Sequence, residues 1–298
     1  MILIADSGST KTDWTLLHSP YPTKWDIIAT FQCQGITPIH QTADDISQIL
    51  ARELIPQLST FPRAALINSK VLEGALLSQI GVYFYGSWCT PAHVPMMKTI
   101  LGDMFSPQNI EVHSDLTAAA RALCQHEPGI ACILGTGANS CMYDGNEIVQ
   151  NTPALGYILG DEGSGSVLGR MFMNAIFKNP QFAAIRDEYL EKEKLTQADV
   201  IQKVYREPLA NRFLATTSKY IKEHLDNPLL RDLVIQNFRQ FFRSNISPYQ
   251  HPELPVHFVG SMAFIYREQL EQAAELEGFH VGRTLQSPME GLVTYHQV

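Results

Sequence analysis

Short apolar runs, each bounded by polar or small residues, dominate the first third of the chain. The run ILIA at residues 2–5 enters a loop of small residues, and the segments DWTLLH and DIIATFQC that follow have the length and composition of strands. Residues 80–86, IGVYFYG, are typical of a buried strand. The pattern predicts a sheet in which residues 6–11 join two antiparallel strands.

Helical spacing alternates with these strands. Thr42 precedes apolar residues spaced three and four apart and has an acid three positions on, which predicts an N-cap. We also expect a helix near residues 95–104, a short strand at 110–113, and a helix over SDLTAAARALCQH with Ser114 or Asp115 at its start. Residues 64–79 carry an ambiguous signal.

The opening pattern returns about 130 residues further along the chain. The stretch GIACILGTGANSCMYDGNEIVQ, residues 129–150, again has the order strand, glycine-rich loop, strand, turn, strand. This recurrence indicates a duplicated domain, with one loop from each copy facing a shared cleft. Two similar hairpins that arose independently are the alternative.

The second half is predicted to be mainly helical. A glycine-punctuated loop, GYILGDEGSGS, leads into an amphipathic helix, and residues 181–245 carry helical patterns throughout. Helix starts are predicted at three positions, namely Thr196, Pro208 as the first helical residue, and Asn227. After a proline-rich connector, VHFVG predicts a buried strand, and Ser261 is expected to cap a helix that Gly278 ends.

Composition excludes several classes of function. A hydrophobic share of 45% in 298 residues is enough for one large or two ordinary domains, and the net charge of −8 argues against a nucleic-acid partner. The first residues form too short an apolar run for a signal peptide, and no stretch approaches the ~20 apolar residues of a membrane span. The five cysteines include no Cys-x-x-Cys pair, so we expect neither a zinc site nor a disulfide framework, and a reducing cytoplasm fits best.

The first loop combines an acid, a glycine, hydroxyls and a lysine, which together suit an anionic group. Its ending GSTKT resembles a P-loop, but with Lys11 as the motif lysine the glycines would fall at Ala5 and Thr10. A P-loop also leads into a helix, whereas a strand follows this loop. The loop still offers backbone N–H groups to a phosphate, and Asp6 could hold a bridging metal. An ordinary hairpin turn is the alternative.

Five motifs in order carry a resemblance to a known superfamily. They are DSGSTKTDW, SDLTAAARAL, ILGTGANS, GDEGSGS and FVGSMA. Together they resemble the acetate and sugar kinase/Hsp70/actin superfamily, and within it the N-acetylglucosamine kinase branch that is grouped with the BadF/BadG/BcrA/BcrD ATPases. The resemblance covers nearly the whole chain. It implies an α/β fold of two ribonuclease H-like (actin-like ATPase) domains, each with a five-stranded mixed sheet and helices, around a central cleft that binds ATP and a small acceptor.

The resemblance also implies the domain organisation. Residues 1–117 would form the N-terminal domain, and residues 118–298 a larger C-terminal domain with a helical insert near residues 181–250. The C-terminal segment is expected to pack back on the N-terminal domain.

Ligands for ATP and Mg²⁺ follow from the same resemblance. Asp6 would lie near the metal, the two hairpin loops would hold the phosphates, and the turn FVGSMA would receive the adenosine. The cofactor-binding residues implied are Asp6, Gly8, Ser9, Thr10 and Lys11 in the first loop, Gly135, Thr136 and Gly137 in the second, and Gly260, Ser261 and Ala263 in the third. From the residues alone, glycine turns and a simple helix start are the alternatives.

Asp115 is the candidate catalytic base. In phosphoryl transfer, a carboxylate within hydrogen-bond reach of the acceptor hydroxyl orients that hydroxyl and takes its proton. An aspartate at the start of an alanine-rich helix is also an ordinary capping residue, and its position alone favours capping. The kinases of this branch have their base in the matching segment, so the resemblance implies catalysis.

Other polar residues and glycines are candidates for binding the sugar. Asp161 is implied to contact the sugar ring, and Glu162 beside it is a second candidate, although both could instead cap the next helix. Asn139 would face phosphate or sugar. The substrate-binding set is Thr37, Gly86, Ser87, Asp115, Asn139, Gly156, Asp161 and Glu162.

Three departures from the family pattern affect the acceptor pocket. Thr37 stands where the related kinases have an asparagine for the sugar, and threonine lacks the paired amide. Leu155 stands where the animal enzymes have tryptophan, so an aromatic platform is missing. Trp88 stands in the loop YGSWC at a position where a small residue is expected, and it would either crowd the cleft or replace the lost platform.

We therefore expect a cytoplasmic, homodimeric kinase without nucleic-acid or membrane partners, which uses Mg·ATP to phosphorylate an amino sugar, with the 6-hydroxyl of N-acetylglucosamine favoured. A BadF-type ATPase that activates a partner enzyme is the alternative from another class. Its iron–sulfur cluster needs cysteine pairs that Cys124, Cys132 and Cys141 do not offer. A non-catalytic sugar- or nucleotide-binding protein is the third possibility.

Overall fold

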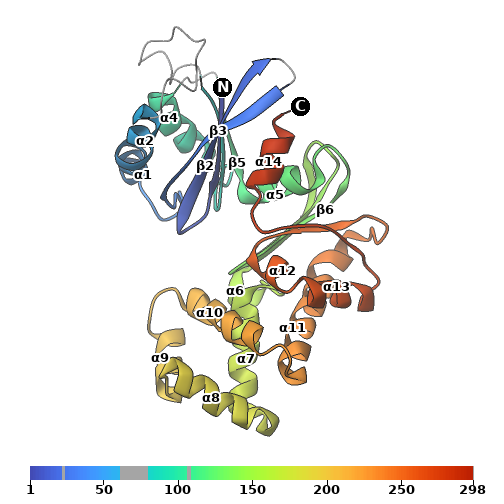
Figure 1. The fold of residues 1–298 in the computed structure, drawn as a ribbon. Coiled ribbons are helices and arrows are strands. Elements are labelled where there is room, and N and C mark those ends of the chain that lie inside the picture. The colour runs from blue at the N-terminus through green and yellow to red at the C-terminus, as the bar shows by residue number, and fades with distance from the viewer. Residues whose placement is uncertain (22–23, 61–79, 106–108, 298) are drawn as a thin grey trace. The chain divides into compact units, whose positions relative to one another are not determined.

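Two compact units make up the chain (Figure 1). The computed structural model describes residues 1–21, 24–60, 80–105 and 109–297. The first unit comprises Met1–Gln125 together with Pro288–Val298, and the second comprises His126–Ser287. The division follows Gln125 rather than residue 117 because the helix after Asp115 packs within the first unit, against the C-terminal helix.

The sheet of the first unit has five strands in the order β3-β2-β1-β4-β5. β2 is antiparallel to both β1 and β3, and β4 and β5 run parallel to β1. The strands are β1 (Ile2–Ser7), β2 (Lys11–Tyr21), β3 (Lys24–Gln34), β4 (Gly81–Gly86) and β5 (Ile110–Ser114). The predicted antiparallel hairpin around residues 6–11 is therefore confirmed.

Helices cover both faces of this sheet (Figure 1). Successive strand residues point to opposite faces, so Leu3 packs with α1 (Ala43–Ile49), α2 (Ile55–Thr60) and α4 (Val94–Met104). Ile4 packs with α5 (Asp115–Cys124) and α14 (Met289–Tyr295) on the other face. Residues 64–79, whose pattern was ambiguous, lie outside the described residues.

The N-cap predicted at Thr42 is confirmed. Thr42 Oγ1 accepts a hydrogen bond from Asp45 N at 3.2 Å, and Asp45 Oδ2 accepts one from Thr42 N at 2.9 Å. This reciprocal pair satisfies two backbone donors that a helix start leaves without partners.

The second sheet repeats the strand order of the first. Its order is β8-β7-β6-β9-β10, with antiparallel pairing on the β7 side of β6 and parallel pairing on the β9 side. The strands are β6 (Gly129–Leu134), β7 (Ala138–Tyr143), β8 (Ile148–Thr152), β9 (Val256–Val259) and β10 (Val281–Leu285). The recurrence in the sequence thus corresponds to a shared topology, although the pattern did not predict β10.

Helices form the rest of the second unit. They are α6 (Gly156–Leu159), α7 (Gly165–Lys178), α8 (Ala183–Glu193), α9 (Gln197–Tyr205), α10 (Ala210–Glu223), α11 (Pro228–Phe241), α12 (Ser261–Ile265) and α13 (Arg267–Leu276). The predicted starts at Thr196 and Asn227 are confirmed as N-caps. No described helix is both long and apolar enough to cross a membrane.

Two predicted helix starts are wrong. Pro208 does not begin a helix, because Leu209 adopts a left-handed backbone with φ of 61° and α10 starts at Ala210. Ser261 does not cap a helix, because Gly260 occupies the cap position and Ser261 is already helical. The helix expected to run from Ser261 to Gly278 is also interrupted, since α12 ends at Ile265 and α13 follows.

Candidate active site

The loop between β1 and β2 is held by hydrogen bonds from two directions. Ser7 Oγ lies 2.7 Å from Thr12 Oγ1 across the hairpin, and Gly8 N donates to Lys11 O at 3.0 Å. Gly35 N, in the segment after β3, donates to Thr10 O at 3.1 Å, and a Cβ atom at Gly35 would lie only 2.4 Å from Gly8 O. Close packing of the two backbones thus fixes the loop.

The side chains of this loop differ in what they offer a ligand. Ser9 and Thr10 are exposed. The Lys11 ammonium lies 2.7 Å from Asp13 Oδ2 and is therefore paired with a carboxylate. Lys11 was expected to bind phosphate, and it would have to share or leave Asp13 in order to do so.

Asp6 lies on β1 beside this loop in an acidic surrounding. Burial, together with the nearby carboxylates of Asp13 and Asp115, raises the pKa of Asp6 to about 7, and Lys11 opposes the shift. A divalent cation would favour the ionised form of such a carboxylate. Mg²⁺ in phosphate sites is commonly held by one or two carboxylates plus the phosphates. The donor set at Asp6 therefore fits Mg²⁺, and no group of three or more ligating side chains occurs among the described residues.

Asp115 begins α5 and accepts a hydrogen bond from the turn after β4. Ser87 Oγ donates to Asp115 Oδ2 at 2.8 Å. Burial raises the pKa of Asp115, against the effect of the Ser87 hydroxyl and of the backbone N–H groups of Leu116 and Asp115 itself. The helix cap is Ser114, whose Oγ accepts from Thr117 N at 3.2 Å. The alternative that Asp115 serves as the N-cap is therefore wrong.

The turn that carries Ser87 is tightly packed. A Cβ atom at Gly86 would lie 2.6 Å from Phe84 Cε1 and 3.0 Å from Cys89 Sγ, so a side chain has no room there. Ser87 N donates to Ser7 O at 2.9 Å, which ties the turn to the end of β1. Trp88 has φ of 63°, an uncommon backbone for a bulky residue, and its side chain is 57% exposed.

Thr37 lies in the segment that follows β3, and it is enclosed. It is only 4% exposed, and its Oγ1 atom is buried with no hydrogen-bond partner among the described residues. Its backbone N donates to Gln41 Oε1 at 2.7 Å. The expected sugar contact of Thr37 is thus not open to solvent in this structure.

The second unit brings three predicted site segments together around Asp161. The Asp161 carboxylate accepts hydrogen bonds from the backbone N–H groups of Ala138 and Gly156. A Cβ atom at Gly137 would lie 3.0 Å from Asp161 Oδ2, so the carboxylate rests against the loop between β6 and β7. Burial raises the pKa of Asp161, and the neighbouring Glu162 adds to the shift.

The start of α7 holds the loop between β6 and β7. Gly165 N donates to Gly135 O at 2.8 Å, and Ser166 N donates to Thr136 O at 3.2 Å. Ser164 Oγ caps α7 by accepting from Val167 N at 3.2 Å. The alternative that Asp161 or Glu162 serves as the N-cap of this helix is therefore wrong.

Asn139 and Glu162 have partners inside the second unit. Asn139 Oδ1 accepts from Ser140 N at 2.9 Å and from Asn151 Nδ2 at 3.0 Å, while Glu162 Oε2 accepts from Asn245 Nδ2 at 3.3 Å. Both were expected to contact ligands, and each side chain is hydrogen-bonded to a residue of its own unit.

The turn from β9 into α12 requires glycine. Gly260 has φ of 120°, and a Cβ atom there would lie 2.4 Å from Leu134 O. Ala263, one of the expected adenosine contacts, is fully buried behind this turn. The backbone of Gly260 and Ser261 is thus what the turn can present to a purine.

Kinase structures resemble this chain over its whole length. A protein described as a putative N-acetylglucosamine kinase from Porphyromonas gingivalis is 45% identical, with 100% of this chain and 99% of that chain covered and a TM-score of 0.84. This chain belongs to the family of that protein. No protein-family model and no curated protein matches the chain.

Two more distant structures share the fold of the family. A protein described in the same words from Chromobacterium violaceum is 16% identical, covers 99% of this chain and 98% of its own, and has a TM-score of 0.66. A ROK family glucokinase from Streptomyces griseus, solved with glucose and AMPPNP, is 14% identical, covers 99% and 97%, and has a TM-score of 0.54. The expected fold class, α/β with two five-stranded mixed sheets of the actin-like ATPase type, is confirmed.

Sequence reasoning missed two features of the first unit. The Ser7–Thr12 pair could have been found, because both hydroxyl residues flank the loop symmetrically. The second feature is a polar cluster around Tyr85, which joins residues 211 positions apart in the chain. No local pattern in the sequence signals that second feature.

Proposed function

We propose that this protein transfers the γ-phosphoryl group of Mg·ATP to a hydroxyl of an amino sugar, with the 6-hydroxyl of N-acetylglucosamine as the favoured acceptor. The observation that carries the proposal is the Ser87–Asp115 hydrogen bond of 2.8 Å at a carboxylate that is not used as the helix cap. The family membership supports it, since the Porphyromonas gingivalis relative is described as such a kinase.

In this proposal Asp115 accepts the proton of the acceptor hydroxyl. Ser87 holds Oδ2 of the carboxylate, and the acceptor hydroxyl is proposed to approach Oδ1. The raised pKa of Asp115 makes it a better proton acceptor in its ionised form than an ordinary aspartate. Phosphoryl transfer needs little covalent help, so positioning and charge neutralisation carry most of the catalysis.

Asp6 is proposed as the residue that holds Mg²⁺, which neutralises phosphate charge when bound. The backbone of the loop around Gly8 is proposed to cradle phosphate oxygens, as is the loop 135–137 of the second unit. Asp161 is proposed to accept hydrogen bonds from sugar hydroxyls, because its position is set by backbone donors rather than by a flexible partner. Grouping with the BadF/BadG/BcrA/BcrD ATPases, the cytoplasmic location and the homodimer are parts of the same proposal.

One assay tests the reaction class. ADP release is measured with Mg·ATP and glucosamine, N-acetylglucosamine, N-acetylmuramic acid, glucose or no sugar. We expect release that depends on N-acetylglucosamine, and phosphate on its 6-hydroxyl by NMR of the product. ATP hydrolysis at the same rate with and without each sugar would favour the ATPase alternative. Sugar binding without any turnover would favour the non-catalytic one.

A variant tests the role of the base. Asp115→Asn keeps the shape of the side chain but removes its basicity, so turnover should fall by at least about 100-fold while ATP affinity stays nearly unchanged. The matched control is Asp103→Asn, the same change at an exposed position of α4 in the same unit. If Asp115→Asn keeps most of its rate, Asp115 is not the base.

A further inference from the structure

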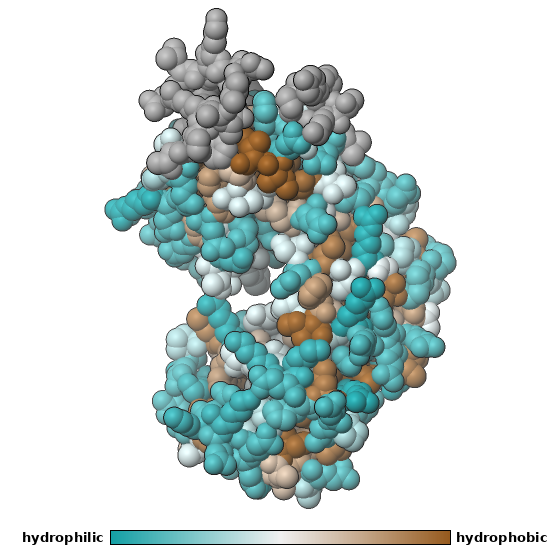
Figure 2. Space-filling model, in the orientation of Figure 1, coloured by the Kyte–Doolittle hydropathy of each residue, from teal (hydrophilic) through white to brown (hydrophobic). Residues whose placement is uncertain are grey.

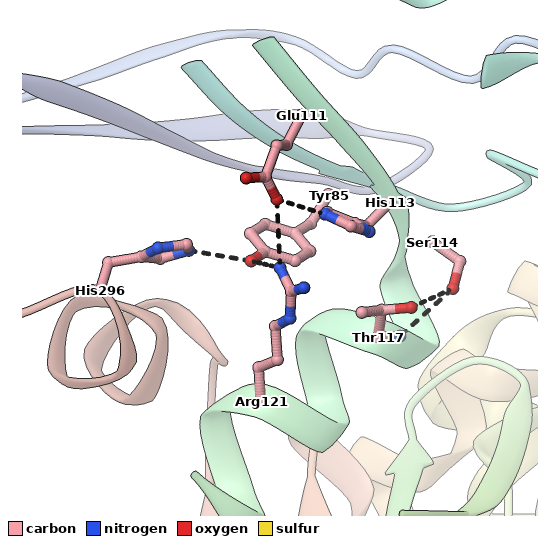
Figure 3. Close-up of polar contacts among 7 residues, drawn as sticks. All are labelled: Tyr85, Glu111, His113, Ser114, Thr117, Arg121 and His296. Atoms are coloured by element: carbon pink, nitrogen blue, oxygen red, sulfur yellow. Dashed lines mark hydrogen bonds and ion pairs between the residues drawn. The ribbon is translucent and has the colours of Figure 1, made fainter. Parts of the chain in front are cut away.

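A second polar cluster lies in the first unit, on the face of the sheet that α5 and α14 cover (Figure 3). Its centre is the fully buried hydroxyl of Tyr85 on β4. Arg121 Nη1 on α5 donates to this hydroxyl at 2.8 Å, and His296 Nε2, just after α14, lies 2.9 Å from it. One oxygen atom thus joins strand β4 to helix α5 and to the residue that follows α14.

Charged groups complete the outer side of the cluster. Glu111 Oε2 accepts a hydrogen bond from His113 Nε2 at 2.9 Å and lies 3.8 Å from Arg121 Nη1. The rings of Tyr85 and His113 stack at 5.4 Å between centroids, with 24° between their planes. The His296 ring rests on Tyr83, with 4.0 Å between centroids.

One hydrogen-bond direction in this cluster is fixed by chemistry, and a neutral His296 ring is compatible with a continuous chain of donors and acceptors. A guanidinium can only donate, so the Tyr85 oxygen accepts from Arg121 and its single proton is left for His296. In this arrangement the neutral His296 ring carries its proton on Nδ1, and Nε2 accepts the hydrogen bond from Tyr85. Burial, followed by the nearby Arg121 charge, lowers the pKa of His296 to about 4, which agrees with a neutral ring.

The cluster is connected to both partners of the Ser87–Asp115 hydrogen bond. Tyr85 precedes Ser87 by two residues on the chain, and His113 precedes Asp115 by two. Tyr85 and His113 are paired across β4 and β5. Arg121 lies on α5, the helix that Asp115 begins. A shift of Tyr85 relative to Arg121 therefore moves the end of β4 relative to the start of α5.

We propose that Tyr85 is a positioning residue, which Arg121 and His296 hold in place so that Ser87 stays in hydrogen-bond contact with Asp115. His296 thereby contributes to the geometry of a base more than 180 positions earlier in the chain. This inference rests on the proposed function, because it takes Asp115 as the base.

Removing one hydroxyl tests the proposal. Tyr85→Phe keeps the buried ring and its stacking but leaves Arg121 and His296 without their shared partner. Misplacement of a catalytic group by less than an ångström lowers the rate, so we expect kcat to fall on the order of tenfold while the KM values for sugar and ATP change little. An unchanged kcat in a folded Tyr85→Phe protein overturns the proposal.

A pair of variants at His296 keeps the test open even if Tyr85→Phe folds poorly. His296→Phe retains a ring to pack on Tyr83 but has no acceptor, so it should show the same fall in kcat. His296→Gln offers an amide oxygen to the Tyr85 hydroxyl, and it should restore most of the rate. An unchanged kcat in His296→Phe would mean that the ring packs without positioning anything, and a loss in His296→Gln as large as in His296→Phe would mean that the hydrogen bond is not what matters; either result contradicts the proposal.

A double-mutant cycle with Ser87→Ala identifies the route of the effect. If Tyr85 acts through Ser87, Tyr85→Phe should lower kcat much less in the Ser87→Ala background than in the wild type. Fully multiplicative losses in the cycle would overturn the proposed route. His257→Ala in the second unit is the control, because it removes another buried histidine and should lower stability without changing kcat.

A readout without turnover separates this inference from the proposed function. The carboxyl resonance of Asp115, assigned with Asp115→Asn, gives its pKa by ¹³C NMR. Loss of the Ser87 hydrogen bond should raise that pKa, and Tyr85→Phe should raise it in the same direction as Ser87→Ala. If the wild type phosphorylates no sugar, the proposed function fails, but this titration still decides whether Tyr85 positions Asp115. No movement of the pKa in Tyr85→Phe overturns the inference.

Discussion

The sheets of the two units share one strand order, but the residues at the loop end of the first hairpin are polar in one unit and apolar in the other. In the first unit the last paired residues are Ser7 and Thr12, whose hydroxyls are hydrogen-bonded at 2.7 Å. In the second unit they are Leu134 and Ala138, both buried and apolar. The same backbone topology thus carries a polar hairpin in one unit and an apolar one in the other.

The units also differ in how they hold their loops. A backbone segment, Gly35 with its neighbours, packs on the first loop, whereas the start of helix α7 packs on the second. Ionisable groups with raised carboxyl pKa values, Asp6 and Asp115, gather in the first unit, while Asp161 is the matching group near the second loop. In the proposed function, metal and proton chemistry would belong to the first unit, and the Asp161 contact with the sugar to the second.

The strongest test of this division compares two aspartates. Asp6→Asn should lower kcat on the order of a thousandfold, because loss of metal binding removes several kcal/mol of transition-state stabilisation. Asp161→Asn should mainly raise the KM for the sugar. Steady-state kinetics with varied Mg²⁺ measures both. A large kcat effect from Asp161→Asn with a small one from Asp6→Asn would reverse the division.

The next largest effect concerns stability of the second unit. Gly260→Ala combines a backbone φ of 120° with a Cβ atom 2.4 Å from Leu134 O. The free energy of unfolding should therefore fall by about 3 kcal/mol. Gly278→Ala is the control, since its φ of 78° is also positive but nothing lies within 4 Å of the new atom. Its cost should be about 1 kcal/mol. Urea unfolding of both variants checks the difference, and equal costs would show that the contact with Leu134 relaxes.

One histidine in each unit should contribute alike to the acid response, while the raised pKa of Asp6 acts in the opposite direction in the first unit. Burial, followed by nearby positive groups, lowers the pKa of His296 in the first unit and of His257 in the second to about 4. The unfolded chain protonates these histidines below about pH 6.5, but the folded protein does so only near pH 4, so stability falls as pH falls between those values. The slope should be at most about 1.4 kcal/mol per pH unit for each histidine.

Single variants separate the two contributions to this slope. His296→Phe should flatten the pH dependence contributed by the first unit, and His257→Ala that of the second. Thermal unfolding from pH 7 to pH 5 measures them. A slope that neither variant changes would mean that other groups control the acid response.

The smallest expected effect is a change in the KM for the sugar when exposed apolar side chains near the candidate sugar contacts are replaced. Trp88 in the first unit is 57% exposed, and Leu155 in the second is 58% exposed. Trp88→Gly should raise the KM for the sugar several-fold through loss of aromatic contact, and it should slightly stabilise the protein because glycine accepts φ of 63°. Leu155→Ala should change the sugar KM less. A larger rise in the sugar KM in Leu155→Ala than in Trp88→Gly would indicate that the sugar contacts Leu155 instead of Trp88.

Much of the fold could be predicted because its signals are local. The hairpin around residues 6–11, the capping box at Thr42 and the caps at Thr196 and Asn227 each depend on residues within a few positions. The failures have local causes as well. Leu209, which follows Pro208, has a left-handed backbone, so the helix begins after it. Gly260, which precedes Ser261, is the N-cap residue of α12.

The candidate site was less accessible to sequence reasoning. The motif around Asp115 pointed to the residue, but only the structure shows that Ser114 takes the cap and that Ser87 contacts the carboxylate. Thr37 is enclosed and Lys11 is paired with Asp13. Both facts depend on how segments pack in three dimensions, and no pattern along the chain predicts them. The contact of Tyr85 with His296 is the extreme case, since it joins the middle of a sheet to the end of the chain.

The return of the chain into the first unit also constrains how the protein is made. On the ribosome, residues 126–287 emerge as one uninterrupted segment and can fold as soon as they are released. The earlier segment lacks α14 until the residues after Ser287 are translated, so the first unit is completed after the second. A nascent chain stalled before residue 288 would therefore expose the sheet surface that Leu292 and Val293 cover in the folded first unit.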